Sequence, residues 1–186
     1  MRVMLTSCGI ETKTIQERFL HWLDKAPADA KALFVPTAAI TTDAIQVLPE
    51  CMNDLLKCGI AKENITVFDL HRNMPADELL TFDVVYLCGG TTAYLLERIN
   101  QTGFRDSLLS YIQQNGLVIG VSAGSMIFVD CLPDNLGLVD VRMSVHSPKT
   151  SLLGKVTFPV TEPIELSNTA AMFIRSIPDD VEIIDG

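Results

Sequence analysis

The feature that most constrains this 186-residue sequence is the alternation of short aliphatic runs with longer segments of helical periodicity. Five short runs have the length and the β-branched content of buried strands. These runs are residues 3–5, 32–35, 65–70, 84–87 and 117–121. Strands that alternate with helices form βαβ units, in which the strands are parallel. The sequence therefore predicts an α/β fold, a three-layer sandwich with a mainly parallel sheet and helices on both faces.

The segments between these runs carry apolar residues at helical spacing. The first helix is expected over residues 15–23, and Thr14 with Glu17 has the spacing of a capping box at its start. Further helices are expected to start at Thr92 and to cover residues 108–112.

A second helix is expected over residues 45–56, where Pro49 would introduce a kink and Gly59 would end the helix. After Gly137 the apolar runs are short and prolines interrupt them. That pattern predicts an irregular, antiparallel C-terminal extension. No repeat or low-complexity tract divides the chain, so residues 1–186 are expected to form a single domain.

Charge and composition exclude several kinds of partner. The chain has 14 basic and 23 acidic residues, a net charge of −9, and no basic run, so we expect no nucleic-acid binding. Its longest uncharged stretch, residues 107–129, is broken by the polar residues 113–116, so we expect no membrane span. Five cysteines without a C-x-x-C pair, and no signal-peptide pattern, indicate reduced thiols in a cytoplasmic protein.

Ligands of open parallel sheets bind beyond the carboxyl ends of the strands. Four loops meet this condition: residues 6–9, 36–38, 88–92 and 120–124. We therefore expect the functional residues to lie in these loops.

Residues 120–124 read Gly-Val-Ser-Ala-Gly, a G-x-S-x-G sequence between an apolar run and a predicted helix. A sharp strand-to-helix turn with small neighbours exposes the serine hydroxyl above the sheet. We interpret Ser122 as a nucleophile, against the alternative of a tight turn with a packing serine. The N–H of Ala123 and the glycine pair Gly89-Gly90 are candidate oxyanion donors, and the pair alternatively cradles a phosphate or forms only a turn.

A nucleophilic serine needs a base, and the chain has three histidines. His21 lies on the first predicted helix, His71 follows a predicted strand, and His146 comes 24 residues after Ser122. The local sequence separates His146 from His71 only slightly as the base.

The acid that would orient the base is less well determined. In hydrolases with the order Ser, Asp, His, the acid lies between the other two residues. Asp130, Asp134 and Asp140 satisfy this order, and Glu162 and Glu165 lie nearby. Surface solvation is the alternative explanation for each of these carboxylates.

Three motifs in this order resemble the peptidase E (aspartyl dipeptidase) and cyanophycinase family. They are residues 87–92 (Leu-Cys-Gly-Gly-Thr-Thr), residues 120–125 and residues 136–140 with the following stretch to His146. The resemblance extends from residue 3 to about residue 146. It implies a serine peptidase fold like that of the class I glutamine amidotransferases.

The resemblance also implies a set of roles. Ser122 corresponds to the nucleophile, His146 to the base, and Gly89-Gly90 with Ala123 to the oxyanion site. Family members cleave small peptides with an aspartyl residue at the bond, and they use no cofactor or metal. On this basis we expect a serine peptidase that forms an acyl-enzyme at Ser122. A homodimer is compatible with this expectation.

Departures from the family pattern affect two assignments. Thr91 stands where the family usually has Asn after the glycine pair, and the stretch from Ser122 to His146 is shorter than usual. Asp134 is the best remaining match for the acid. The cyanophycinase-like Glu would fall in residues 166–170, which contain none, and the nearest is Glu165.

Selection of acidic peptides would require a local cation, for which Arg142 and Arg175 are candidates. Two other functions are compatible with the sequence. One is a catalytically impaired family member that binds a small molecule or anion at the glycine loops. The other is a thiol enzyme or sensor that uses Cys8 or Cys88.

Overall fold

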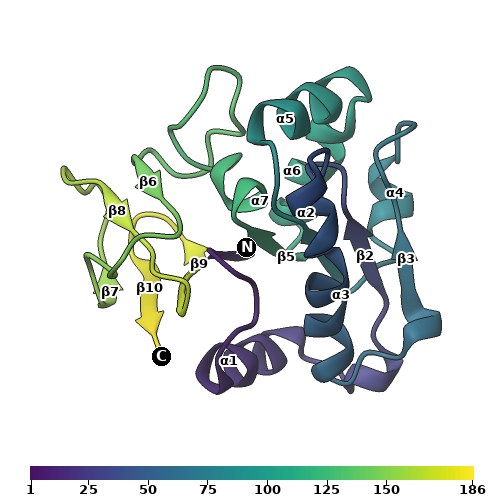
Figure 1. Cartoon of the computed structure of the whole chain (residues 1–186), viewed down its shortest axis with the longest axis horizontal. Helices are drawn as coiled ribbons and strands as arrows, with labels where there is room; N and C mark the ends of the chain where they lie inside the picture. Colours follow the sequence, from purple (N-terminus) through teal and green to yellow (C-terminus); the bar gives the residue numbers. More distant parts are fainter.

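An eight-stranded sheet forms the centre of the computed structural model, which describes residues 1–186 (Figure 1). The strand order is β3-β2-β4-β5-β1-β9-β10-β7. The first five strands of this order are parallel: β3 (Ile65–Val67), β2 (Ala32–Val35), β4 (Val84–Leu87), β5 (Leu117–Val121) and β1 (Arg2–Thr6). The predicted parallel sheet is confirmed. Only β3 is shorter than predicted: it ends at Val67, and Leu70, the last residue of the predicted strand, has a left-handed φ of 55° that a strand does not accept.

The C-terminal segment extends the sheet in the antiparallel sense. Its three strands in the main sheet are β9 (Ala170–Ser176), β10 (Asp180–Asp185) and β7 (Gly154–Val156), with β9 against β1. The remaining strands, β6 (Met143–Ser144) and β8 (Ile164–Glu165), form a separate pair that is parallel. The prediction of antiparallel strands is wrong for this pair, since the long connection through β7 leaves room for a parallel return.

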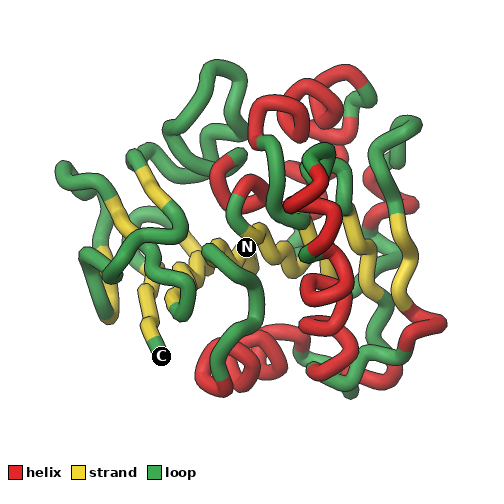
Figure 2. The backbone as a smooth tube through the Cα atoms, viewed as in Figure 1, coloured by secondary structure: helices red, strands yellow, loops and turns green.

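Helices cover both faces of the parallel part of the sheet. Along β1, Met4 faces one cluster of 20 buried residues, whereas Val3 and Leu5 face another of 36. The smaller cluster includes α1 (Lys13–Leu23) and α3 (Leu48–Lys57), and the larger includes α4 (Ala76–Leu79), α5 (Thr92–Gln101), α6 (Phe104–Gln113) and α7 (Ala123–Met126). Figure 2 shows the helices in red around the parallel strands, while the C-terminal end consists of strands and loops.

Two details of the helices differ from the prediction. The helix α1 is capped by Thr12, whose side chain accepts a hydrogen bond from the N–H of Ile15, so the capping box at Thr14 and Glu17 is wrong. The expected kinked helix is two helices, α2 (Thr42–Gln46) and α3. Pro49 lies in the first turn of α3. Backbone N–H groups in the first turn have no acceptor within the helix, so proline is tolerated there.

The remaining elements are two short 3₁₀ helices, η1 (Pro27–Asp29) and η2 (Lys62–Asn64). Gly59 ends α3 with a φ of 90°, as predicted. None of the helices combines the length and the hydropathy that a membrane crossing requires.

The turn between β5 and α7 packs directly on backbone. A Cβ atom on Gly120 would lie 2.4 Å from the carbonyl oxygen of Gly124, and one on Gly124 would lie 2.3 Å from that of Leu87. Only glycine allows β4, β5 and α7 to approach so closely. This contact holds Ser122 at the carboxyl edge of the sheet, beside the ends of β1 and β4.

We expect Gly124→Ala to lower the free energy of unfolding by about 1–3 kcal/mol, because the added methyl group meets the backbone of β4. Urea denaturation of the variant measures this loss. The control is Ser110→Ala in α6, which adds no atom and loses only an exposed hydrogen bond from Gln114. Equal stability of the two variants would contradict the proposed close contact.

Candidate active site

Ser122 and His146 form a hydrogen-bonded pair at the carboxyl edge of the sheet. Ser122 has the strained backbone angles φ 49° and ψ −109° at the start of α7, and its N–H donates to the carbonyl of Thr6 at 2.9 Å. Its Oγ lies 2.9 Å from Nε2 of His146. This distance is within the reach of a general base, so the arrangement is suited to activating the hydroxyl.

The other ring nitrogen of His146 is held by an amide. Its Nδ1 lies 2.9 Å from Oδ1 of Asn168, in the loop before β9. An amide oxygen accepts a hydrogen bond, so the proton of the neutral imidazole is held on Nδ1. Nε2 is then free to accept the proton of the Ser122 hydroxyl.

Two buried serines connect the segments that carry the site. The Ser7 hydroxyl accepts from the N–H of His146 at 3.1 Å and donates to the carbonyl of Leu166 at 3.0 Å. The fully buried Ser125 accepts from the N–H of Thr6 at 2.9 Å. The position of the imidazole therefore depends on the loop after β1 as well as on its own loop.

Asp185, at the end of β10, organises the loop that carries Asn168. Its carboxylate accepts hydrogen bonds from Thr150 at 2.5 Å, from Thr169 at 2.6 Å and from Ser167 at 2.9 Å. The bonds from Thr150 and Thr169 are the main reasons why the pKa of Asp185 is lowered. Because Ser167 and Thr169 flank Asn168, this carboxylate fixes the backbone on both sides of the amide.

Three backbone N–H groups near Ser122 are available to a ligand. The N–H groups of Gly89 and Gly90 make no hydrogen bond within the protein, and that of Ala123 is at the first position of α7. A Cβ on Gly89 would lie 3.2 Å from Cβ of Ser122, so this loop is adjacent to the hydroxyl. The N–H of Thr91 donates to the carbonyl of Ala38 at 2.7 Å and does not face the site as a free donor.

A cavity of about 210 Å³ opens beside the Ser122–His146 pair. The glycine pair Gly89-Gly90 and Val121 form one part of its wall, and residues of α3 form another. Its titratable groups include the carboxylates of Glu11, Glu50 and Asp54. No cluster of three or more His, Cys, Asp or Glu side chains has the arrangement of a metal site.

Asp54 is the most buried of these carboxylates. Its Oδ2 accepts a hydrogen bond from the Tyr86 hydroxyl at 2.6 Å and another from the N–H of Ile10 at 3.0 Å. Burial raises the pKa of Asp54, although the bond from Tyr86 opposes this effect. The carboxylate thereby joins α3 to β4 and to the loop after β1.

The cysteines considered as reactive groups have raised pKa values. Cys8 lies in the cavity wall with its Sγ 3.6 Å from Nδ1 of His146, and burial, followed by the charge of Glu11, raises the pKa of its thiol. Burial raises the pKa of the Cys88 thiol well above its usual value. Reactive cysteines have lowered pKa values, so the structure favours the serine.

The structure does not bring Asp134 to the imidazole, and this prediction needs correction. Asp134 is exposed in the loop after α7, where its carbonyl accepts a hydrogen bond from Arg105 of α6 at 2.9 Å. The same loop borders α5, where Asp134 lines a cavity with residues of that helix. Glu165 also makes no contact with the imidazole, and its N–H donates to Ser151. The partner of the ring is Asn168.

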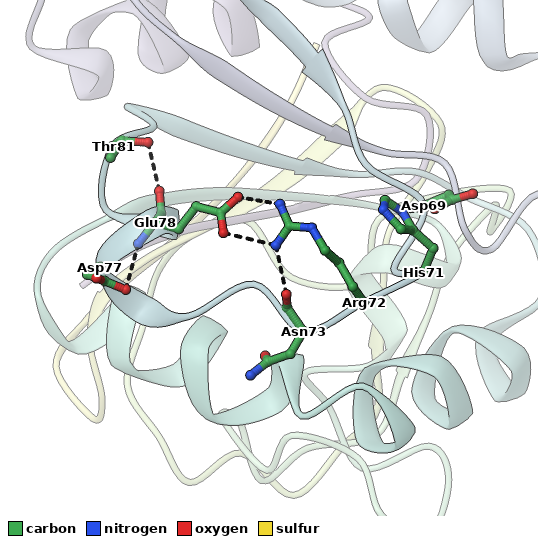
Figure 3. A network of polar contacts seen from close by, with 7 residues as sticks. All are labelled: Asp69, His71, Arg72, Asn73, Asp77, Glu78 and Thr81. Carbon is green, nitrogen blue, oxygen red and sulfur yellow. Dashed lines mark hydrogen bonds and ion pairs between the residues drawn. The ribbon is translucent and has the colours of Figure 1, made fainter.

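His71 is separate from the site. Its Nδ1 lies 2.6 Å from Oδ1 of Asp69, in the segment between β3 and α4 (Figure 3). The neighbouring Arg72 forms two hydrogen bonds with Glu78, of 2.9 and 2.5 Å. Of the two histidines considered as the base, only His146 contacts Ser122.

Asn168 is the site residue that the sequence did not identify. Its segment, residues 166–170, is where the cyanophycinase-like Glu would fall, and it contains no acidic residue. The available signal was an amide between two hydroxyl residues, Ser167 and Thr169, directly before a strand. Such a sequence is common in loops and does not by itself indicate a contact with a distant histidine.

Residues 3–144 match the model of the family described as Peptidase family S51. The chain belongs to peptidase family S51. The match to S51 includes Ser122 and the glycine pair Gly89-Gly90, and it ends before His146 and Asn168. The geometry of those two residues is therefore an observation independent of the family match.

Similar proteins agree with the S51 assignment. An uncharacterized peptidase of Pasteurella multocida (strain Pm70) is 28% identical over 94 residues, and one of Listeria innocua serovar 6a is 30% identical over 94 residues. In each case the matched segment covers 50% of this chain and 45% of the relative, so the chain spans about half the length of these curated relatives.

Solved structures share the fold along the whole chain. A Listeria monocytogenes EGD-e protein provisionally named peptidase E superimposes with a TM-score of 0.72 at 22% identity, covering 99% of this chain and 98% of that one. A peptidase from an acI-B1 Actinobacterium superimposes with a TM-score of 0.71 at 17% identity, covering 100% of this chain and 87% of that one.

We expect Asp185→Asn to lower the free energy of unfolding at pH 7. Since the folded-state pKa of Asp185 is lowered, its stabilisation is present above the unfolded value of about 3.9 and is lost as the pH falls through the folded value. The difference from the wild type should therefore shrink below pH 4. Urea denaturation at pH 7 and pH 3 tests this, with Asp180→Asn at the other end of β10 as control. An equal loss at both pH values would contradict a role for the charge.

Proposed function

We propose that this S51 protein is a serine peptidase that hydrolyses short peptides through an acyl-enzyme at Ser122. The observation that carries the proposal is the 2.9 Å distance between Ser122 Oγ and His146 Nε2. The contact of Nδ1 with Asn168 supports it, because that contact presents Nε2 as the proton acceptor.

The proposed reaction has two halves. Ser122 Oγ attacks the carbonyl carbon while His146 Nε2 takes its proton, and the same nitrogen then protonates the departing amine as the C–N bond breaks. Water, deprotonated by His146, attacks the resulting ester and releases the acid and the free hydroxyl. The ring alternates between base and acid, so the reaction balances without another co-reactant.

The tetrahedral intermediate requires donors for its oxyanion. The unpaired N–H groups of Gly89 and Ala123 are next to Ser122, and that of Gly90 belongs to the wall of the same cavity, so we assign this role to the three groups. One such donor is typically worth about 3 kcal/mol of transition-state stabilisation. Thr91 contributes no backbone donor in this assignment.

The size of the cavity supports a small substrate. Sites for drug-sized ligands enclose roughly 300–1,000 Å³, and this cavity encloses about 210 Å³. The Ser122 side chain is half-buried and His146 is exposed, so a peptide end has access to the pair.

The aspartyl preference implied by the resemblance has no support in the cavity. Arg142 borders a different cavity, together with Asp134, and Arg175 lies 5.4 Å above the ring of Trp22. No arginine or lysine lines the cavity beside Ser122. The three carboxylates there also disfavour an anion-binding module.

Labelling with a fluorophosphonate probe tests the proposed nucleophile. We expect the wild type to be labelled and Ser122→Ala to be unlabelled, because the probe reacts with an activated serine hydroxyl. His146→Ala should slow labelling by roughly 10³-fold or more, since the base is lost. Ser110→Ala on α6 is the control and should label as the wild type does. Failure of the wild type to label would refute the proposal.

The role of Asn168 is tested by the rate of the same labelling. We expect Asn168→Ala to slow it about tenfold, because Nδ1 loses its hydrogen-bond acceptor. Asn168→Asp should retain labelling, since a carboxylate oxygen accepts the same hydrogen bond. An Asn168→Ala variant that folds normally and labels at the wild-type rate would show that the amide does not position the ring.

A further inference from the structure

We propose that the cavity beside Ser122 selects substrates that carry a positively charged nitrogen next to the scissile bond. The inference rests on the proposed peptidase function and adds a substrate class to it. The nitrogen is either that of a basic side chain or the free α-ammonium of a short peptide.

The negative charge of the cavity comes from two elements. Glu11 lies in the loop between β1 and α1, while Glu50 and Asp54 lie four residues apart on α3 and therefore on the same helix face. All three line the same cavity as Ser122 and His146. A cation bound there would be attracted from two sides.

Asp54 points to a ligand independently of the other two carboxylates. Asp54 is only 9% exposed, and its Oδ2 already accepts two hydrogen bonds. Its Oδ1 has no partner within the protein, although the residue lines the cavity. This oxygen is accessible from the cavity rather than sealed off, so it is free to accept a hydrogen bond from a cationic nitrogen of the substrate.

No basic side chain of the protein neutralises these carboxylates. None of the five ion pairs in the molecule includes Glu11, Glu50 or Asp54. Lys57 lies one turn further along α3, within electrostatic range of Asp54, but it does not line the cavity. The net negative potential therefore repels an acidic side chain and attracts a cation.

The rest of the cavity wall is suited to the stem of such a side chain. Ala44 and Val47, from the α2–α3 segment, and Val121, at the end of β5, provide apolar surface. Lysine and arginine side chains place their methylene groups on apolar surface and their charge at its polar end. A basic side chain thus matches both parts of the wall, and an α-ammonium matches the acidic part alone.

Matched dipeptides test the inference on the whole chain. Lys-Ala and norleucine-Ala have similar side-chain length and differ in charge, so their ratio of kcat/KM reports the side-chain nitrogen. Ala-Ala-Ala and N-acetyl-Ala-Ala-Ala differ in the α-ammonium. We expect the cationic member of at least one pair to be cleaved about tenfold or more faster, as for a hydrogen bond to a charged group.

Charge-removing variants show whether the cavity causes the preference. The double variant Glu11→Gln/Glu50→Gln changes two exposed residues. It should reduce the kcat/KM ratio of the cationic to the neutral member several-fold in whichever pair shows the preference. Asp54→Asn should reduce that ratio further. Glu63→Gln, in η2, removes an exposed carboxylate away from the cavity and should leave the ratio unchanged. A preference that survives in the double variant and in Asp54→Asn would overturn the assignment.

Protection against labelling gives a second readout that needs no turnover. Lysinamide should slow fluorophosphonate labelling of wild-type Ser122 more than norleucinamide does. Labelling without any cationic preference, in cleavage or in protection, overturns this inference and leaves the peptidase proposal standing. Faster cleavage of Asp-Ala than of Lys-Ala also overturns it. Absence of labelling in the wild type overturns both.

Discussion

The close backbone packing of the β5–α7 turn is the constraint on which the candidate site depends. The carbonyl of Leu87 lies where a side chain at residue 124 would be, so the turn is fixed against β4. This contact also brings the glycine loop after β4 next to Ser122, with the N–H groups of Gly89 and Gly90 unpaired. A single packing requirement therefore places both the hydroxyl and the donors assigned to the oxyanion.

The imidazole reaches this turn from a different part of the chain. The antiparallel addition of β9 to β1 places Asn168 near the loop after β1, and Ser7 hydrogen-bonds to both His146 and Leu166. Asp185 then fixes the residues on either side of Asn168. The parallel half of the sheet thus supplies the serine, the loop after β6 supplies the histidine, and the segment before the antiparallel strand β9 supplies its amide partner.

Much of the parallel half could be predicted from the sequence, because its signals are local. Aliphatic runs identified all five parallel strands, and the glycines around Ser122 identified the turn. The partner of His146 could not be found in this way. Asp134 fits the residue order of hydrolases, but residue order does not specify the path of a loop, and this loop packs on Arg105. The position of Asn168 beside the imidazole depends on the pairing of β9 with β1, which is a contact between segments far apart in the sequence.

The pairing of β1 with β9 also governs the order in which the site is assembled. Residues 3–6 pair with residues 171–174, so the two strands are separated by most of the chain. Contacts between such distant segments form slowly during folding, because the intervening loop must first be closed. During synthesis the turn at Ser122 emerges well before β9 does. A nascent chain that ends before residue 168 therefore has the serine and the imidazole but lacks the amide that holds Nδ1 of His146.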